Sequence, residues 1–232
     1  MDVIWSAMPL LITGAGYTIL ITVIAVSLGS VIGLFFGLGR LSRNKLVSFL
    51  STCYVDFFRG TPLLVQIYLV YFGGPQVLTV FQDYLMQNFG MPQLIDTHIP
   101  PFVAAVISTS LNSGAYVAEI FRAGIQSIER GQMEAARSLG MTHRQAMRYI
   151  ILPQAFKRII PPMGNEFIAM LKDTSLLSVI GFEELARRGQ LIISETYLAF
   201  QIWMIVAFIY LIMTLLISRL VDYLERRLKT GD

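Results

Sequence analysis

The sequence predicts an all-α membrane protein that crosses the bilayer five times. Of its 232 residues, 55% are hydrophobic and only 14% are charged, whereas a soluble domain carries about 25% charged residues. The charged residues cluster, which leaves apolar windows of the roughly 20 residues that a spanning helix needs. Basic residues lie at the ends of these windows and are not interleaved with aromatic residues on a polar face, so we expect no nucleic-acid partner.

The first predicted span, residues 10–38, carries no charged residue over 29 positions. At about 1.5 Å per residue such a helix reaches ~44 Å, which exceeds the roughly 30 Å hydrocarbon core, so it must tilt or protrude. Asp2 is the only charged residue before this span, whereas a cleaved signal peptide starts with basic residues. Gly29, Gly33 and Gly37 recur every four residues, which is typical of close helix contact, although glycine is also common in membrane helices.

Four further spans are expected, at residues 46–72, 99–118, 161–180 and 200–220. With the first they make one transmembrane domain, residues 10–220, followed by a basic tail at 221–232. The fourth is expected to begin after two consecutive prolines. Five spans cannot form two equal inverted halves, so any two-fold symmetry must come from a second subunit.

Basic residues predict the orientation, because cytoplasmic loops are enriched in lysine and arginine. Lysine and arginine occur three times in 40–45, seven times in 119–158 and four times in 219–229. The opposite side carries only Arg187 and Arg188. We therefore expect the N-terminus outside the cell, and the 119–158 loop and the C-terminus in the cytoplasm.

The 119–158 loop contains a predicted docking helix. Glu134 in its first turn favours the positive helix end, and Gly140 is placed to end it. Its small residues and single apolar side chain suit a groove on another protein, while the alternative is a helix lying on anionic lipid. The candidate coupling residues are Glu134, Ala135, Ala136, Leu139 and Gly140.

A second short helix is expected at about 142–152, with Thr142 as its N-cap. Pro153 is then expected to turn the chain toward the membrane.

A helix break is predicted near the midpoint of the second span, at Gly60, Thr61 and Pro62. Thr61 can cap a helix and Pro62 fits a first helical position. The exposed N–H groups of such a half-helix would attract a substrate carboxylate, while the alternative is a simple proline kink. Asp56 and Arg59 are three residues apart and are expected to neutralise each other on one helix face.

Polar residues form stripes on the third and fourth spans. Such residues often mark a transport route, although their hydrogen bonds also hold helix bundles together. Glu166, which shares a helix face with Met170 and Asp173, needs a counter-charge near the midplane. Lys172 on the adjacent stripe is one candidate, and a cationic substrate is the alternative. The candidate substrate-binding residues are Thr61, Gln66, Ser108, Asn112, Asn165, Glu166 and Met170.

No catalytic motif is present. The sequence lacks GxxxxGK[ST], HExxH and GxSxG, so we expect no enzyme, and no ATP, metal or other cofactor bound by this chain. His98 and His143 lie outside the spans, which argues against a proton relay. Cys53 is expected to be a buried small hydrophobe.

Several motifs resemble one transporter family. The pattern EAA-x3-G-x9-I-x-LP at 134–153 is similar to the EAA loop of bacterial ABC-importer permeases. The resemblance narrows to the polar amino-acid subfamily, which handles histidine, glutamine, glutamate, arginine and cystine, and it covers roughly residues 10–225. The narrowing motifs are RGTP at 59–62, NSGAY at 112–116, GNE at 164–166 and LKDTSL at 171–176.

The resemblance implies a type I ABC-importer permease fold in the bacterial cytoplasmic (inner) membrane. It implies two ATPase subunits that bind ATP and Mg, a second permease subunit that is identical or paralogous, and an extracytoplasmic amino-acid-binding protein. In this family the EAA helix couples the permease to its ATPase, and a polar amino acid crosses by alternating access. The alternative is an ion-gradient-driven secondary amino-acid transporter or channel subunit, which would not need the EAA helix.

Overall fold

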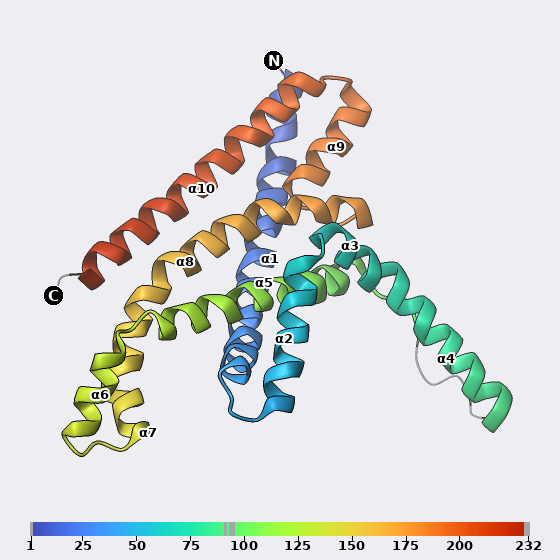
Figure 1. Cartoon of the computed structure of the whole chain (residues 1–232). Coiled ribbons are helices and arrows are strands. Elements are labelled where there is room, and N and C mark those ends of the chain that lie inside the picture. The colour runs from blue at the N-terminus through green and yellow to red at the C-terminus, as the bar shows by residue number, and fades with distance from the viewer. Residues whose placement is uncertain (1, 91, 93–95, 230–232) are drawn as a thin grey trace.

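The computed structural model describes residues 2–90, 92 and 96–229, and every regular element within them is a helix (Figure 1). Residues 230–232 of the predicted basic tail lie outside the described part. The π-helices η1 and η2 and the 3-10 helix η3 each continue from an α-helix. The elements are α1 (Asp2–Arg40), α2 (Lys45–Gly60), α3 (Leu63–Tyr68), η1 (Leu69–Gly73), α4 (Gly74–Phe89), α5 (Pro101–Gln126), α6 (Arg130–Ser138), α7 (His143–Ala146), η2 (Met147–Ile151), α8 (Leu152–Asp173), η3 (Thr174–Ile180), α9 (Leu185–Thr196) and α10 (Ala199–Lys229).

Helix α1 packs along α5 through the predicted glycine stripe. A Cβ atom added to Gly33 would lie 2.7 Å from the Cβ atom of Val117, and one added to Gly37 would lie 2.9 Å from the carbonyl oxygen of Ala118. Gly29 also meets α5 at 2.9 Å. Real Cβ atoms do not approach their neighbours so closely, so the stripe is a close-contact surface, and the prediction of close helix contact is confirmed.

Helices α8, α9 and α10 form the other part of the bundle and pack against α1 (Figure 1). The buried Glu184 carboxylate joins three of these elements. It accepts the backbone N–H groups of Ala186 and Arg187, which caps α9, and the hydroxyl groups of Thr18 on α1 and Tyr210 on α10. The core around it includes Leu11, Leu171, Leu185, Ile202 and Val206.

The chain between α2 and α5 differs from the predicted span at 46–72. Helix α2 ends at Gly60, a helix restarts at Leu63, and it runs through η1 and α4 to Phe89, so a long helix extends beyond the predicted end. In Figure 1, α4 projects away from the bundle. The helix passes the predicted end at residue 72 because Gly73, Gly74 and Pro75 do not interrupt it.

The helix that carries the fourth predicted span begins earlier than expected. Helix α8 starts at Leu152 and passes through Pro161 and Pro162. The expected turn at Pro153 is wrong, because Pro153 follows the π-helix η2 within a continuous helical segment and does not end it. Ile151, the residue before α8, has helical backbone angles, so η2 leads directly into α8.

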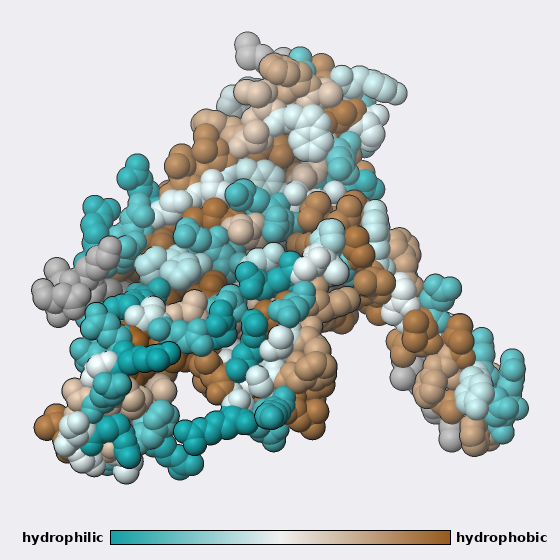
Figure 2. All heavy atoms as spheres, viewed as in Figure 1, coloured by the Kyte–Doolittle hydropathy of each residue, from teal (hydrophilic) through white to brown (hydrophobic). Residues whose placement is uncertain are grey.

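Within the described residues, three helices are long and apolar enough to cross a membrane by length and composition: Trp5–Arg40, Leu63–Phe89 and Ala199–Arg227. Figure 2 shows hydrophobic side chains over α10 and α2, whereas a hydrophilic band lies over α5 and α8 and continues to α6 and α7. On this face of the molecule, the hydrophilic side chains therefore gather over α5 and α8. Cys53 is exposed on α2, so the prediction of a buried thiol is wrong; only one face of α2 packs on the bundle.

Candidate functional site

The break between α2 and α3 is held open by a buried amide. Thr61 and Pro62 have extended backbone angles, which leaves carbonyl groups of the last turn of α2 without helical partners. The Gln66 side chain, only 2% exposed, donates to the carbonyl oxygens of Phe58 at 2.8 Å and Thr61 at 3.0 Å, and to the Thr61 hydroxyl at 2.9 Å. Its own oxygen accepts from the Asn112 side chain of α5 at 2.9 Å. The predicted break is therefore stabilised by specific side-chain hydrogen bonds.

The capping roles at this break differ from the prediction. The Thr61 hydroxyl donates to the carbonyl oxygen of Phe57, so it satisfies the end of α2. Pro62 is the residue before α3, and Leu63 is its first helical residue.

A cavity of about 420 Å³ lies beside the break, between α2, α5 and the end of α8. Two of the predicted substrate residues, Thr61 and Asn112, line this cavity, and Gln66 forms hydrogen bonds with both. Asp173 also lines the cavity and makes no hydrogen bond or salt bridge within the described part of the chain. The cavity therefore offers a hydroxyl, an amide and an unpaired carboxylate to a small polar molecule. The remaining lining residues are Arg59, Gly60, Pro62, Leu63, Tyr116 and Leu176.

The other four predicted substrate residues do not line this cavity. Ser108 donates to backbone carbonyl groups within α5. The buried Glu166 carboxylate accepts from the Ser113 hydroxyl at 2.8 Å, so it joins α8 to α5. Met170 packs against α1, and Asn165 is exposed. Ser113 is a neutral donor, and no salt bridge to Glu166 occurs among the described residues, so its expected contact with a substrate cation stays a prediction.

Sequence reasoning did not include Arg59, Tyr116 and Asp173 among the site residues. Asp173 had a usable signal, because it shares the helix face of Glu166 and Met170. Arg59 belongs to the RGTP motif and Tyr116 to the NSGAY motif, so the motifs contained these residues although neither was named as a site residue.

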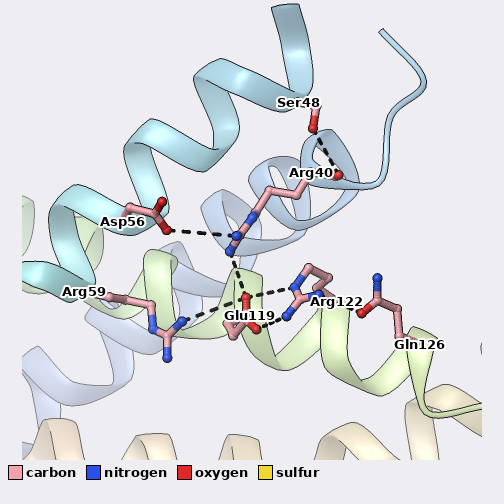
Figure 3. Close-up of polar contacts among 7 residues, drawn as sticks. All are labelled: Arg40, Ser48, Asp56, Arg59, Glu119, Arg122 and Gln126. Atoms are coloured by element: carbon pink, nitrogen blue, oxygen red, sulfur yellow. Dashed lines mark hydrogen bonds and ion pairs between the residues drawn. The ribbon is translucent and has the colours of Figure 1, made fainter. Parts of the chain in front are cut away.

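A cluster of charged side chains joins α1, α2 and α5 beyond the cavity (Figure 3). The Glu119 carboxylate accepts from Arg40 at 2.8 Å and from two nitrogens of Arg122, and it lies 3.9 Å from Arg59. The hydrogen bond from Arg122 holds the pKa of Glu119 below its ordinary value, helped by the charges of Arg122, Arg40 and Arg59 and opposed by burial. Asp56 lies 4.0 Å from Arg40, so its predicted pairing with Arg59 is wrong.

Helices α6 and α7 form a hairpin that presents one large apolar side chain. Leu139, in the turn after α6, is 84% exposed. Gly140 has a φ of +82°, a conformation that favours glycine, and its N–H group donates to the carbonyl oxygen of Arg137. Thr142 caps α7 through a capping box with Gln145, which confirms the predicted N-cap.

The five predicted coupling residues occupy different places on this hairpin. Glu134, Ala135, Leu139 and Gly140 are exposed, whereas Ala136 is buried and faces the bundle. Helix α6 begins at Arg130, so Glu134 lies in its second turn, and the prediction that it neutralises the helix end is wrong. The hairpin rests on a core that includes Ile128, Ile151, Ala155 and Ile159.

Comparisons with known proteins cover almost the whole chain. Residues 29–230 match the family described as binding-protein-dependent transport system inner membrane component. The glutamine transport system permease protein GlnP of Escherichia coli strain K12 is 42% identical over 226 residues, which is 97% of this chain and 96% of that protein. The arginine transport system permease protein ArtQ of Bacillus subtilis strain 168 is 35% identical over 97% of this chain and 94% of its own length.

A solved structure agrees in both sequence and fold. The crystal structure of an amino acid ABC transporter with histidines has a chain that is 47% identical and superposes with a TM-score of 0.84. The match covers 97% of this chain and 96% of that one. The break, the cavity and the hairpin all lie within the matched residues of the family.

Proposed function

The chain belongs to the family of binding-protein-dependent transport system inner membrane components and is the permease subunit of an ABC amino-acid importer, and we propose that the cavity at the α2–α3 break is where its amino acid passes. The protein is a transport component and not a catalyst. ATPase subunits and a second permease subunit complete an importer of this kind. The observation that carries the proposal is the meeting of Thr61, Asn112 and the unpaired Asp173 around one cavity.

We infer that the substrate is a polar amino acid whose ammonium group faces Asp173. Among the described residues Asp173 has no hydrogen-bond or salt-bridge partner, although the charge of Lys172 acts on it, so it can serve as the counter-charge for a substrate cation. Thr61 and Asn112 add a hydroxyl and an amide that fix orientation, as polar groups in small-molecule sites do. A relative named for glutamine and one named for arginine support a substrate with a polar side chain.

The chain is proposed to cross a bacterial inner membrane five times, with the N-terminus outside and the C-terminus in the cytoplasm. The distribution of basic residues supports this orientation, because the 119–158 segment, which holds the α6–α7 hairpin, carries seven of them. An extracytoplasmic binding protein is proposed to deliver the amino acid, and two ATPase subunits are proposed to bind ATP and Mg on the cytoplasmic side.

The α6–α7 hairpin is proposed to be the surface that an ATPase subunit grips. Leu139 offers an apolar side chain for a groove, and Glu134 and Ala135 are exposed on the same hairpin. The backbone is helical from α7 through η2 and α8 to Asp173, so a movement of the hairpin is carried directly to the cavity wall. This continuity provides a physical route for alternating access, in which ATP binding and hydrolysis move the hairpin.

The test is uptake in liposomes that contain the permease, its ATPase subunits and its binding protein. We expect a polar amino acid to stimulate ATP hydrolysis and to accumulate only with ATP. Asp173→Asn should lower the transport efficiency by about 10- to 100-fold, since a hydrogen bond to a charged group is worth about 1.5–3 kcal/mol. The matched control is Asp83→Asn, which changes an exposed aspartate on α4.

Two results would contradict the proposal. Uptake that persists without ATP would exclude coupling to an ATPase. Equal transport by the wild type and Asp173→Asn, with Asp83→Asn also unchanged, would remove Asp173 from the substrate route.

A further inference from the structure

Two neighbouring cavities share two residues. The first is the 420 Å³ cavity at the helix break, and Arg59 and Tyr116 belong to its lining. The second, of about 390 Å³, is also lined by Arg59 and Tyr116, and it extends past Ile120 and Ala123 to Ser127 and Pro162. The second cavity therefore lies along α5 toward the loop that is proposed to be cytoplasmic. Arg59 and Tyr116 separate the two.

The shared residues contact each other across two helices. Arg59 is in the last turn of α2, and its guanidinium carbon lies 5.4 Å from the centroid of the Tyr116 ring on α5. A guanidinium over an aromatic ring is attracted to it, but weakly when water has access. The contact therefore joins α2 to α5 through a weak interaction.

Arg59 is the least firmly held arginine of the charged cluster. Its nearest nitrogen lies 3.9 Å from Glu119, compared with 2.8 Å for Arg40, while Arg122 makes two hydrogen bonds to the same carboxylate. Its side chain is 41% exposed, compared with 19% for Arg40 and 30% for Arg122. Glu119 would keep both of its close partners if Arg59 left, so the movement of Arg59 costs the cluster little.

The cluster also carries a surplus positive charge. Three guanidinium groups share the two carboxylates of Asp56 and Glu119. Arg59 is the member that lines both cavities, so the surplus charge is available to an anion in either one. A guanidinium binds a carboxylate through two parallel hydrogen bonds, a geometry that it does not reach with Glu119 at 3.9 Å.

We propose that Arg59 and Tyr116 form a movable partition on the cytoplasmic side of the substrate cavity, and that Arg59 leaves Glu119 to bind the α-carboxylate of the amino acid as it passes. The inference rests on the proposed function of the first cavity. The ammonium group then faces Asp173 while the carboxylate meets Arg59, so the cavity complements both charges of an amino acid. The second cavity also contains the Glu119 carboxylate and the guanidinium of Arg158, which donates to the carbonyl oxygen of Ser127.

The test uses cysteine labelling in inside-out vesicles that contain the assembled transporter. Cys53→Ser removes the native thiol, Thr61→Cys places a probe in the first cavity, and Ser127→Cys places one in the second. Negatively and positively charged methanethiosulfonate reagents of similar size are compared from the cytoplasmic side. We expect Ser127→Cys to react faster than Thr61→Cys. The ratio of negative to positive reagent rates at Thr61→Cys reports the charge of Arg59 against that of Asp173 in the first cavity.

Removal of either partition residue should change the labelling of Thr61→Cys in a different way. Arg59→Gln should lower the ratio of negative to positive reagent rates at least about tenfold, the effect of one unit charge a few Å away in a partly wet cavity. Arg59→Lys should keep most of the ratio. Tyr116→Leu should speed both reagents. Arg148→Gln is the matched control, because Arg148 lies 6.0 Å from the centroid of the Tyr149 ring and is in the lining of neither cavity.

The outcomes separate this inference from the proposed function. An unchanged ratio in Arg59→Gln, or unchanged rates in Tyr116→Leu, would overturn the partition. If labelling of Thr61→Cys also fails to block uptake, the first cavity is not the substrate route and both proposals fall. If it blocks uptake while the partition variants behave as wild type, only the partition falls. Leu176→Cys provides a second probe of the first cavity should Thr61→Cys not assemble.

Discussion

The contact between α1 and α5 should be sensitive to a single methyl group at Gly33. In Gly33→Ala the new Cβ atom would lie 2.7 Å from Val117 Cβ and 2.8 Å from the backbone nitrogen of Ala118. Neither atom is the end of a flexible side chain, so one helix must move. Gly16→Ala on the same helix is the control, because its Cβ atom meets nothing within 4 Å.

The expected loss follows from these distances. Overpacking of a well-packed core costs about 1–3 kcal/mol. The better helix propensity of alanine returns about 0.5–1 kcal/mol in both variants, so Gly33→Ala should be about 1–3 kcal/mol less stable than Gly16→Ala. For a chain of this size that difference lowers Tm by about 2–12 °C.

The assay is thermal unfolding of the purified permease in detergent, together with uptake by the assembled transporter. Displacement of α5 would also move Asn112 away from Gln66, so uptake should fall with stability. Val117→Ala in the Gly33→Ala background should recover part of the loss, because it removes the clash with the Val117 Cγ1 atom but not with its Cβ atom. Equal Tm values for Gly33→Ala and Gly16→Ala would refute the close-contact argument.

Two further predictions concern the hairpin and the charged cluster. Leu139→Ala should weaken ATPase binding by about 10-fold or more with Tm unchanged, because burial of an exposed leucine contributes about 1.5–3 kcal/mol. The affinity is measured by pull-down, with Leu215→Ala as the control. An unchanged affinity of Leu139→Ala for the ATPase subunit would contradict the prediction. Folding lowers the pKa of Glu119, so its stabilisation is complete above its ordinary value of 4.5 and is lost as pH falls through the lowered value. Glu119→Gln should therefore flatten the acid side of a Tm–pH curve, whereas Glu195→Gln should not.

The helical class, the glycine stripe and the hairpin could be predicted because each depends on local or periodic features. A charge-free window of 29 residues can only satisfy its backbone as a helix in a bilayer. Thr142 followed by Gln145 specifies a capping box within four residues, and Gly140 specifies a left-handed turn. The break at Thr61 and Pro62 is likewise a property of the local backbone.

The composition of the cavity could not be predicted in the same way. Glu166 and Asp173 lie on one face of α8, and nothing local distinguishes the carboxylate that Ser113 occupies from the one left without a partner. Arg59 has a carboxylate three residues away, yet it lies near Glu119, which is sixty positions along the chain. Each of these outcomes depends on how α2, α5 and α8 are rotated against one another.

The sequence by itself determined that this chain is a helical membrane protein with a capped hairpin in a basic loop, because apolar windows, charge placement and capping residues act over short stretches of chain, and its motifs indicated the permease family. Only the tertiary structure decided which charged side chains are already paired and which remain available to a substrate. The physical reason is that a buried charge is satisfied by whichever group the packing brings within hydrogen-bond distance, and that group comes from another helix.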